Sequence, residues 1–287
     1  MGLLSGLSNL GLGTLEEAEI YGEEKKEEKE AKAAVAEAAP VKVFDENEVL
    51  FDKSCECPVC NKSFTYRAVR TGKARLIGQD PDLRPKYENF EPAKYDVIVC
   101  PNCGYAVLTK YFAPLPQAQI KLIKDNIYGK VKGVACSKVI SFDEAITRYQ
   151  LALASSIVKR AKDSEKAYVC LKLAWIVRAK KESLDENTEN YDEVMAQLRN
   201  DENEAFNSAF EGFVSARQKE NFPIAGMDEI TLDYLLAVMA SRFGKYEIAQ
   251  KLISSILMSK TANNRIKDRA RDLKEQVIME MKMNSNG

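Results

Sequence analysis

Two short cysteine motifs carry the clearest chemistry in this chain. Each has the form Cys-x-x-Cys, at Cys57 and Cys60 and again at Cys100 and Cys103, and a proline follows the first cysteine of each. Four thiolates are the complete tetrahedral ligand set of a structural zinc ion, with Zn–S bonds of about 2.3 Å. The sequence therefore predicts one structural Zn²⁺ bound by these four cysteines, with no open coordination position for a reactive water.

The residues after each motif suit tight turns around a metal. Asn61 and Gly104 directly follow the second cysteines, and Asn and Gly tolerate the positive φ angles that such turns need. Residues 61–99 separate the motifs, which is longer than the common spacing of about 15 to 20 residues. Because loop-closure entropy grows only logarithmically, the extra length costs about 0.7 kcal/mol against about 10–16 kcal/mol for zinc binding. We therefore expect both motifs to share one ion.

A thiol oxidoreductase is the main alternative for a Cys-Pro-x-Cys sequence, and unligated buried thiols are a further one. A redox site lies at a helix N-terminus in a βαβ context, whereas residues 64–70 alternate in a pattern typical of a strand. Cys55 could replace Cys57 as a ligand, but Cys57 and Cys60 already have the spacing of a metal-binding turn. With Cys136 and Cys170, the total is seven cysteines, an odd number typical of a reducing cytoplasm.

Composition excludes several classes of function. The 287 residues suffice for two modest domains, and the formal net charge of −1 provides no overall field that would attract nucleic acid or acidic membrane. No apolar run reaches the length of a transmembrane helix, and the N-terminus lacks the features of a secretory signal. Histidine is absent, which excludes Ser-His-Asp and Cys-His catalysis. We expect a cytoplasmic protein that is not an enzyme.

The chain divides into three predicted regions. Residues 1–40 combine a leucine- and glycine-rich start with a charged, alanine-rich run, and are predicted to form a flexible tail. The leucine segment is either disordered or docks on a partner or on the body of the chain itself. Residues 41–115 are predicted to form a zinc-ribbon-like module in which a strand flanks each motif and a long insertion separates them. Residues 116–287 are predicted to be helical.

The insertion interleaves basic and aromatic residues, a pattern that suits nucleic acid, but acidic residues lie among them. Internal ion pairing that orders the loop is therefore the alternative interpretation. The candidate binding surface consists of Arg67, Arg70, Arg75, Asp80, Asp82, Arg84, Tyr87 and Tyr95.

The helical region contains a degenerate repeat. Ser141 and Glu144 form a capping box at the start of one helix, and Gly, Tyr and Ala recur at matching positions from Gly244 onward. This spacing resembles tetratricopeptide repeats, so the predicted fold class is mainly α, with helical hairpins stacked after a four-cysteine zinc module and a small β ribbon. A polar interruption over Lys181–Asn203 departs from the repeat period, and Asn264–Met283 is predicted to be a basic closing helix.

Several motifs together resemble a known family. They are Cys57-Pro58-x-Cys60, Asp80-x-Asp82-x-Arg84-x-x-Tyr87, Pro92-x-x-Tyr95-Asp96 and Cys100-Pro101-x-Cys103-Gly104-Tyr105-Ala106. The combination resembles the bacterial family called domain of unknown function 2225, over roughly residues 50–275. The resemblance implies a cytoplasmic bacterial protein with a metal site and a helical region, and it implies no activity.

These observations favour an interaction or scaffold protein whose helical region accepts a protein or peptide partner. The alternative is RNA or DNA binding through the insertion and the basic closing helix. A Cys-x-x-Cys thiol oxidoreductase is the third hypothesis.

Overall fold

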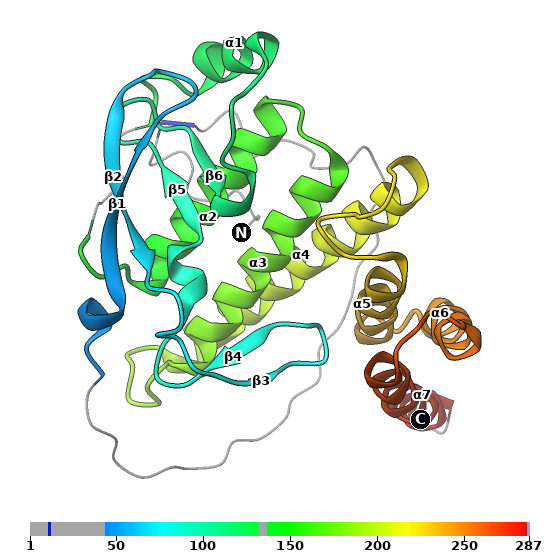
Figure 1. The fold of residues 1–287 in the computed structure, drawn as a ribbon. Coiled ribbons are helices and arrows are strands. Elements are labelled where there is room, and N and C mark those ends of the chain that lie inside the picture. Colours follow the sequence, from blue (N-terminus) through cyan, green and yellow to red (C-terminus); the bar gives the residue numbers. More distant parts are fainter. Residues whose placement is uncertain (1–10, 13–43, 132–136, 286–287) are drawn as a thin grey trace.

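The computed structural model describes residues 11–12, 44–131 and 137–285. In this part of the chain, three small antiparallel strand pairs precede a mainly helical body (Figure 1). The predicted fold class, mainly α with a small β unit, is confirmed. The likeness of the helical pairs to tetratricopeptide repeats stays a prediction.

The strands form three separate two-stranded sheets. Strand β1, Leu50–Glu56, pairs with β2, Ser63–Val69, so that Leu50 lies opposite Val69. Strand β5, Val97–Val99, pairs with β6, Ala106–Leu108; both strands are buried throughout and pack against α2. The third pair lies within the insertion, for which the sequence predicts loops, and consists of β3, Leu76–Gln79, and β4, Pro85–Tyr87. Short 3₁₀ helices occupy Glu46–Val49 (η3), Pro92–Tyr95 (η4) and Thr109–Tyr111 (η5).

The helices pack largely in chain order. Contacts join α2 to α3, α3 to α4, α5 to α6 and α6 to α7. Helix α3 lies in the middle of the molecule, between the strands and α4 (Figure 1). The helices are α1 (Gln117–Asn126), α2 (Phe142–Val158), α3 (Asp163–Glu182), α4 (Tyr191–Lys219), α5 (Glu229–Arg242), α6 (Tyr246–Met258) and α7 (Asn264–Ser285).

The predicted polar interruption over Lys181–Asn203 is wrong for most of its length. Helix α4 begins at Tyr191, so only residues 183–190 separate it from α3. Charged residues are compatible with a helix, and one of those in the first half of α4, Glu202, is buried against α3 and accepts hydrogen bonds from Arg178 and Lys181. A run that is polar in sequence thus forms part of a helix–helix interface.

Helix starts follow ordinary capping chemistry. The Ser141 hydroxyl accepts a hydrogen bond from the Glu144 amide at 3.1 Å, as the predicted capping box requires of its serine. The Asp228 carboxylate does the same for Thr231 at the start of α5. The predicted closing helix corresponds to α7.

A small part of the leucine-rich tail is described, and it is docked on the body of the chain. Leu12 is 1 % exposed and belongs to the hydrophobic core. Gly11 has a φ of +81°, and a Cβ there would lie 2.2 Å from the Lys130 carbonyl oxygen. The rest of the predicted tail, and Cys136, lie outside the described residues. No helix among the described residues is long and apolar enough to cross a membrane.

Candidate metal centre

The two cysteine motifs form turns of the same design. The first turn joins β1 to β2 and the second joins β5 to β6. In the first, the Asn61 amide donates to the Cys57 carbonyl at 2.9 Å and the Cys57 amide donates to the Lys62 carbonyl at 3.1 Å. In the second, the Gly104 amide donates to the Cys100 carbonyl at 2.9 Å, and the Cys100 amide donates to the Tyr105 carbonyl at 2.8 Å. Each hairpin therefore fixes its own pair of thiols.

The residues that close the turns adopt the predicted backbone conformation. Asn61 has a φ of 56° and Gly104 a φ of 77°. At Gly104 the surroundings add a second constraint, because a Cβ there would lie 2.6 Å from the Cβ of Val131. Glycine is thus required at this position both by the turn and by the packing of the segment that follows α1.

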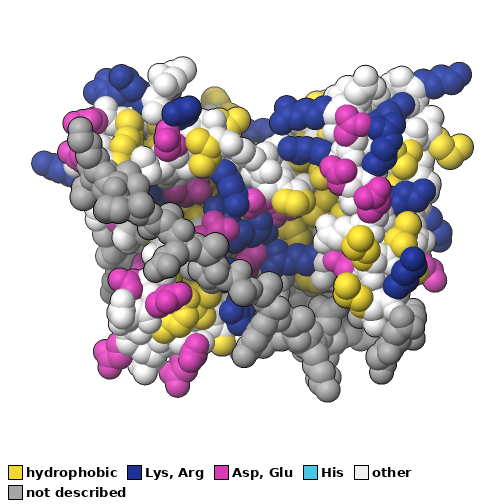
Figure 2. Space-filling model, turned by 90° about the horizontal axis from the view of Figure 1, so that it is seen from below, with side chains coloured by type: hydrophobic (Ala, Val, Ile, Leu, Met, Phe, Trp, Pro, Cys, Tyr) yellow, Lys and Arg dark blue, Asp and Glu magenta, His cyan; other side chains and the backbone are white. Residues whose placement is uncertain are grey.

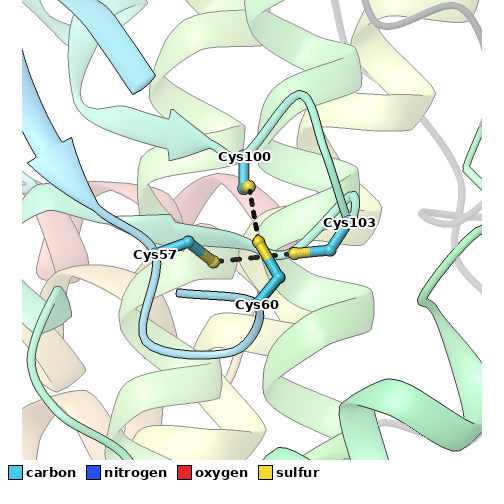
Figure 3. Close-up of side chains that lie close together, drawn as sticks. All are labelled: Cys57, Cys60, Cys100 and Cys103. Carbon is cyan, nitrogen blue, oxygen red and sulfur yellow. Dashed lines mark hydrogen bonds between the residues drawn. The ribbon is translucent and has the colours of Figure 1, made fainter. Parts of the chain in front are cut away.

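The four predicted ligands meet at one point (Figure 3). Their sulfur atoms all lie within 4.8 Å of one another. The sulfur of Cys57 is 3.6 Å from that of Cys103, and the sulfur of Cys60 is 3.7 Å from that of Cys100. A tetrahedron with Zn–S bonds of about 2.3 Å has edges of about 3.8 Å, whereas a disulfide bond is only about 2.05 Å long. The donor set and its spacing therefore fit a zinc site with four cysteine ligands.

The thiols are shielded from water, and this makes a cation necessary if they are to ionise together. Cys57, Cys100 and Cys103 are buried, and Cys60 is partly buried. Hydrogen bonding to Cys100 raises the pKa of the Cys57 thiol to about 12, and hydrogen bonds from Cys103 and Cys57 lower the pKa of Cys100 to about 2. Hydrogen bonding to Cys100 and to Cys57 raises the pKa of Cys103. A Zn²⁺ ion would supply the positive charge that four neighbouring thiolates require.

The other described cysteines lie outside this cluster. Cys55 lies on β1 opposite Phe64, and burial raises the pKa of its thiol. Cys170 is fully buried within α3. Among the described residues, the four clustered cysteines are the group of Cys, Asp and Glu side chains that could hold a metal ion.

The predicted binding surface is divided rather than continuous. Arg67 donates to Asp52 and to the Lys138 carbonyl, and Arg70 donates to the Leu50 carbonyl. Arg75 is exposed and bonded to Glu88. Tyr87 is partly buried on β4.

Tyr95 is not a surface residue at all. It is 4 % exposed, and its hydroxyl donates to Glu46 at 2.6 Å and accepts from the Ile140 amide at 3.2 Å. Burial is the main cause that raises its pKa, followed by the hydrogen bond to Glu46. Its aromatic ring therefore belongs to the core and is unable to stack on a nucleic-acid base.

Asp80, Asp82 and Arg84 do come together, but they bind α3. The buried Asp82 carboxylate accepts from the Trp175 indole at 3.2 Å and from Arg178 at 2.7 Å. Asp80 accepts from Arg178 at 3.1 Å, and Arg84 donates to Glu182 at 2.6 Å. Since Asp82 and Arg84 are buried, they hold the insertion on the helical body instead of presenting a surface.

The residues on the helical side of this network were not among the site residues predicted from the sequence. Arg178 follows the apolar run of Trp175 in α3, and Glu202 lay in the predicted interruption. Glu202 accepts from Arg178 at 2.8 Å, from Lys181 at 2.6 Å and from Arg242 at 2.8 Å. Burial alone would raise its pKa, but the three cations outweigh burial and lower it to about 2. A charge directly after an apolar run was the available signal for Arg178. We call the linked side chains of Asp80, Asp82, Arg178, Glu202 and Arg242 the charge ladder.

Comparison with known proteins places these features in a family. A family model described as "Uncharacterized protein conserved in bacteria (DUF2225)" matches residues 50–277. An uncharacterized protein of Borreliella burgdorferi is 32% identical over 85 residues, which cover 27% of this chain and 30% of that protein. The match thus spans less than a third of that relative's length. No solved structure matches. Because the model covers both cysteine turns, the charge ladder and the helices as far as α7, the chain belongs to the DUF2225 family.

Proposed function

We propose that this protein is a non-enzymatic interaction module whose β unit is stabilised by one structural zinc ion. Cys57, Cys60, Cys100 and Cys103 bind the ion, and the helical body offers its surface to a protein partner. The observation that carries the proposal is the convergence of two equally built turns on four thiols within 4.8 Å of one another. Four cysteine ligands complete a tetrahedral shell, which is the arrangement of structural rather than catalytic zinc.

The surroundings of the thiols favour this role over thiol redox chemistry. Neither turn precedes a helix, since the first leads into β2 and the second into β6. A reactive thiolate needs a partly exposed, electropositive position, which a helix N-terminus commonly provides. The cluster is buried instead, and its sulfur atoms face one another (Figure 3).

The pairing of the insertion also favours a protein partner over nucleic acid. A nucleic-acid stripe is an uncompensated basic face. In the insertion, the guanidinium groups of Arg67 and Arg75 each lie 3.2 Å from a carboxylate, and that of Arg84 lies 2.6 Å from one. These cations contribute to internal order, so we expect no steep salt dependence of binding to mixed RNA or DNA.

The test joins metal content to partner binding. Protein purified from zinc-replete cells should contain about one zinc per chain, and a Cys100→Ser variant should lose it. Affinity purification with both proteins should recover a partner with the wild type and lose it with Cys100→Ser. Cys55→Ser is the matched control, because Cys55 lies outside the cluster and its variant should keep both zinc and partner. Wild-type protein without near-stoichiometric metal would contradict the proposal at its first step.

A further inference from the structure

A cavity lies between the insertion and the last helices of the chain. Its volume is about 440 Å³, and its walls come from the turn between β3 and β4, from α3, α4, α5 and α7, and from the start of α6. Figure 2 shows the molecule hollowed between its two sides, with basic, acidic and hydrophobic side chains gathered in the hollow. The size and the mixed lining are those of a binding site for a side chain or a small molecule.

The cations of the cavity are already compensated. Arg178 donates to Asp80, Asp82 and Glu202, which accounts for all three of its nitrogen atoms. Arg242 donates to Glu202 at 2.8 Å and to the Asn203 side-chain oxygen at 2.7 Å. Both guanidinium groups also lie over the ring of Phe206, at 5.9 and 4.6 Å from its centroid. These contacts hold the two arginines in place and satisfy their charge.

Glu280 is the exception among the charged groups that line the cavity. Its carboxylate accepts hydrogen bonds from the Ser241 hydroxyl at 3.2 Å and from the Gln276 side-chain amide at 2.8 Å. Both donors are neutral, and within the described part of the chain no lysine or arginine forms an ion pair with Glu280. The two donors fix the direction of the carboxylate. Each of its oxygens can accept one further hydrogen bond, because a carboxylate oxygen can accept two.

The uncompensated charge determines the chemistry of the ligand. A phosphate or other dianion would meet the carboxylates of Asp82 and Glu280, so an anionic ligand is disfavoured. An ammonium group would complete the hydrogen bonds of Glu280 and neutralise it. Val238 and Leu273 also line the cavity and provide apolar surface for an aliphatic stem. A primary ammonium on a flexible stem is the chemistry of lysine.

We propose that this cavity binds a lysine side chain of a protein partner, with the lysine ammonium at Glu280. The inference rests on the interaction role proposed above and names the chemistry that the partner must present. Lysine combines a compact charge with three donors and a four-carbon stem, which suits a single carboxylate at the wall of an apolar cavity.

The test uses the full-length, zinc-loaded, ¹⁵N-labelled protein and two peptides of defined sequence. The probe is acetyl-Gly-Leu-Lys-Leu-Gly-amide, and its neutral counterpart carries norleucine in place of lysine. We expect the lysine peptide to shift the NMR signal of the Gln276 side-chain amide and to bind at least five-fold more tightly than the norleucine peptide. Glu280→Gln should weaken binding of the lysine peptide by about five-fold, the effect of one partly buried ion pair.

Glu275→Gln is the matched control, because Glu275 lies on the same helix, is exposed, and does not line the cavity. This variant should bind the lysine peptide like the wild type. Circular dichroism and zinc content identify any variant that fails to fold. Equal binding of the two peptides, unchanged binding by Glu280→Gln, or the absence of any shift at Gln276 would overturn the proposal.

Two further probes test whether the cavity prefers an acidic side chain or a free amine to a lysine side chain. If the same peptide with glutamate in place of lysine binds more tightly, Arg242 governs the cavity and the proposal is wrong. If n-butylamine binds as tightly as the lysine peptide, the ligand is a free amine and the assignment to a protein partner is overturned. These outcomes leave the zinc site intact. Failure of the proposed interaction role would give a different result: the wild-type protein would recover no partner whose binding depends on Cys100.

Discussion

Two groups of side chains hold the long insertion in place, the cysteine cluster and the charge ladder, and they differ in kind. The cysteine cluster joins two turns of one design, each held by its own backbone hydrogen bonds. The charge ladder joins the turn after β3 to α3, α4 and α5, and its Arg178–Asp82 hydrogen bond links residues 96 positions apart. The cluster depends on the local geometry of its two turns and on the zinc ion that we propose it binds, whereas the ladder exists only when the helices are packed. We therefore expect the two to fail independently.

Removal of the metal should produce the largest effect. Cys100→Ser takes away one of four ligands, and zinc binding is worth about 10–16 kcal/mol in small zinc domains, which equals or exceeds the stability of a typical domain. We expect amide hydrogen-exchange protection to be lost in β1, β2, β5 and β6 and retained in α5 and α6. Cys55→Ser should keep the wild-type pattern. Full protection of the strands in a zinc-free variant would show that the cluster does not hold the β unit.

A substitution of Arg178 in the charge ladder should lower the free energy of unfolding by less than removal of the metal, and it should leave the metal in place. Arg178→Met leaves the buried carboxylates of Asp82 and Glu202 short of a partner, and loss of one partner of a buried ion pair costs about 3–5 kcal/mol. Urea denaturation measures the change, and metal analysis should still find about one zinc per chain. Arg75→Met is the control, because Arg75 is exposed and its ion pair is worth less than about 1 kcal/mol. Zinc loss in Arg178→Met would mean that the cysteine cluster and the charge ladder are coupled.

The same difference explains what could be predicted from the sequence. The cysteine cluster depends on two motifs with short internal spacings, and Asn61 and Gly104 mark its turns, so the sequence alone located the cluster. The ladder depends on which charged residues of distant helices meet, and no local pattern encodes that. Glu202 illustrates the limit: a glutamate in a polar run predicts a solvated loop, yet packing of α4 on α3 buries it to 1 % exposure. The polarity of the run was misleading there, because tertiary packing decides which of its residues are buried.

Acid should weaken the ladder through Glu202. Its folded pKa of about 2 lies below the unfolded value near 4.5, so its contribution is present above pH 4.5 and is lost as the pH falls toward 2. A shift of this size corresponds to about 3 kcal/mol. The wild type should therefore lose about 3 kcal/mol more stability than Glu202→Gln between pH 6 and pH 2, measured by urea denaturation. Protonation of the cysteines also releases zinc in acid, but it affects both proteins alike. If the stabilities of the wild type and Glu202→Gln fell in parallel between pH 6 and pH 2, the assignment of this acid sensitivity to Glu202 would be contradicted.

The contact of Leu12 with the core is a third kind of contact, and its removal should give the smallest change in stability. Leu12 lies in the core although it precedes the region that the family model matches. Leu12→Ala removes buried methyl groups and should destabilise the protein by about 2 kcal/mol, the low end of the range for buried leucines. Leu76→Ala is the control, since Leu76 is 59 % exposed and its variant should change stability by less than about 0.5 kcal/mol. Equal denaturation midpoints for the two variants would show that the contact of Leu12 with the core adds nothing to the stability of the protein.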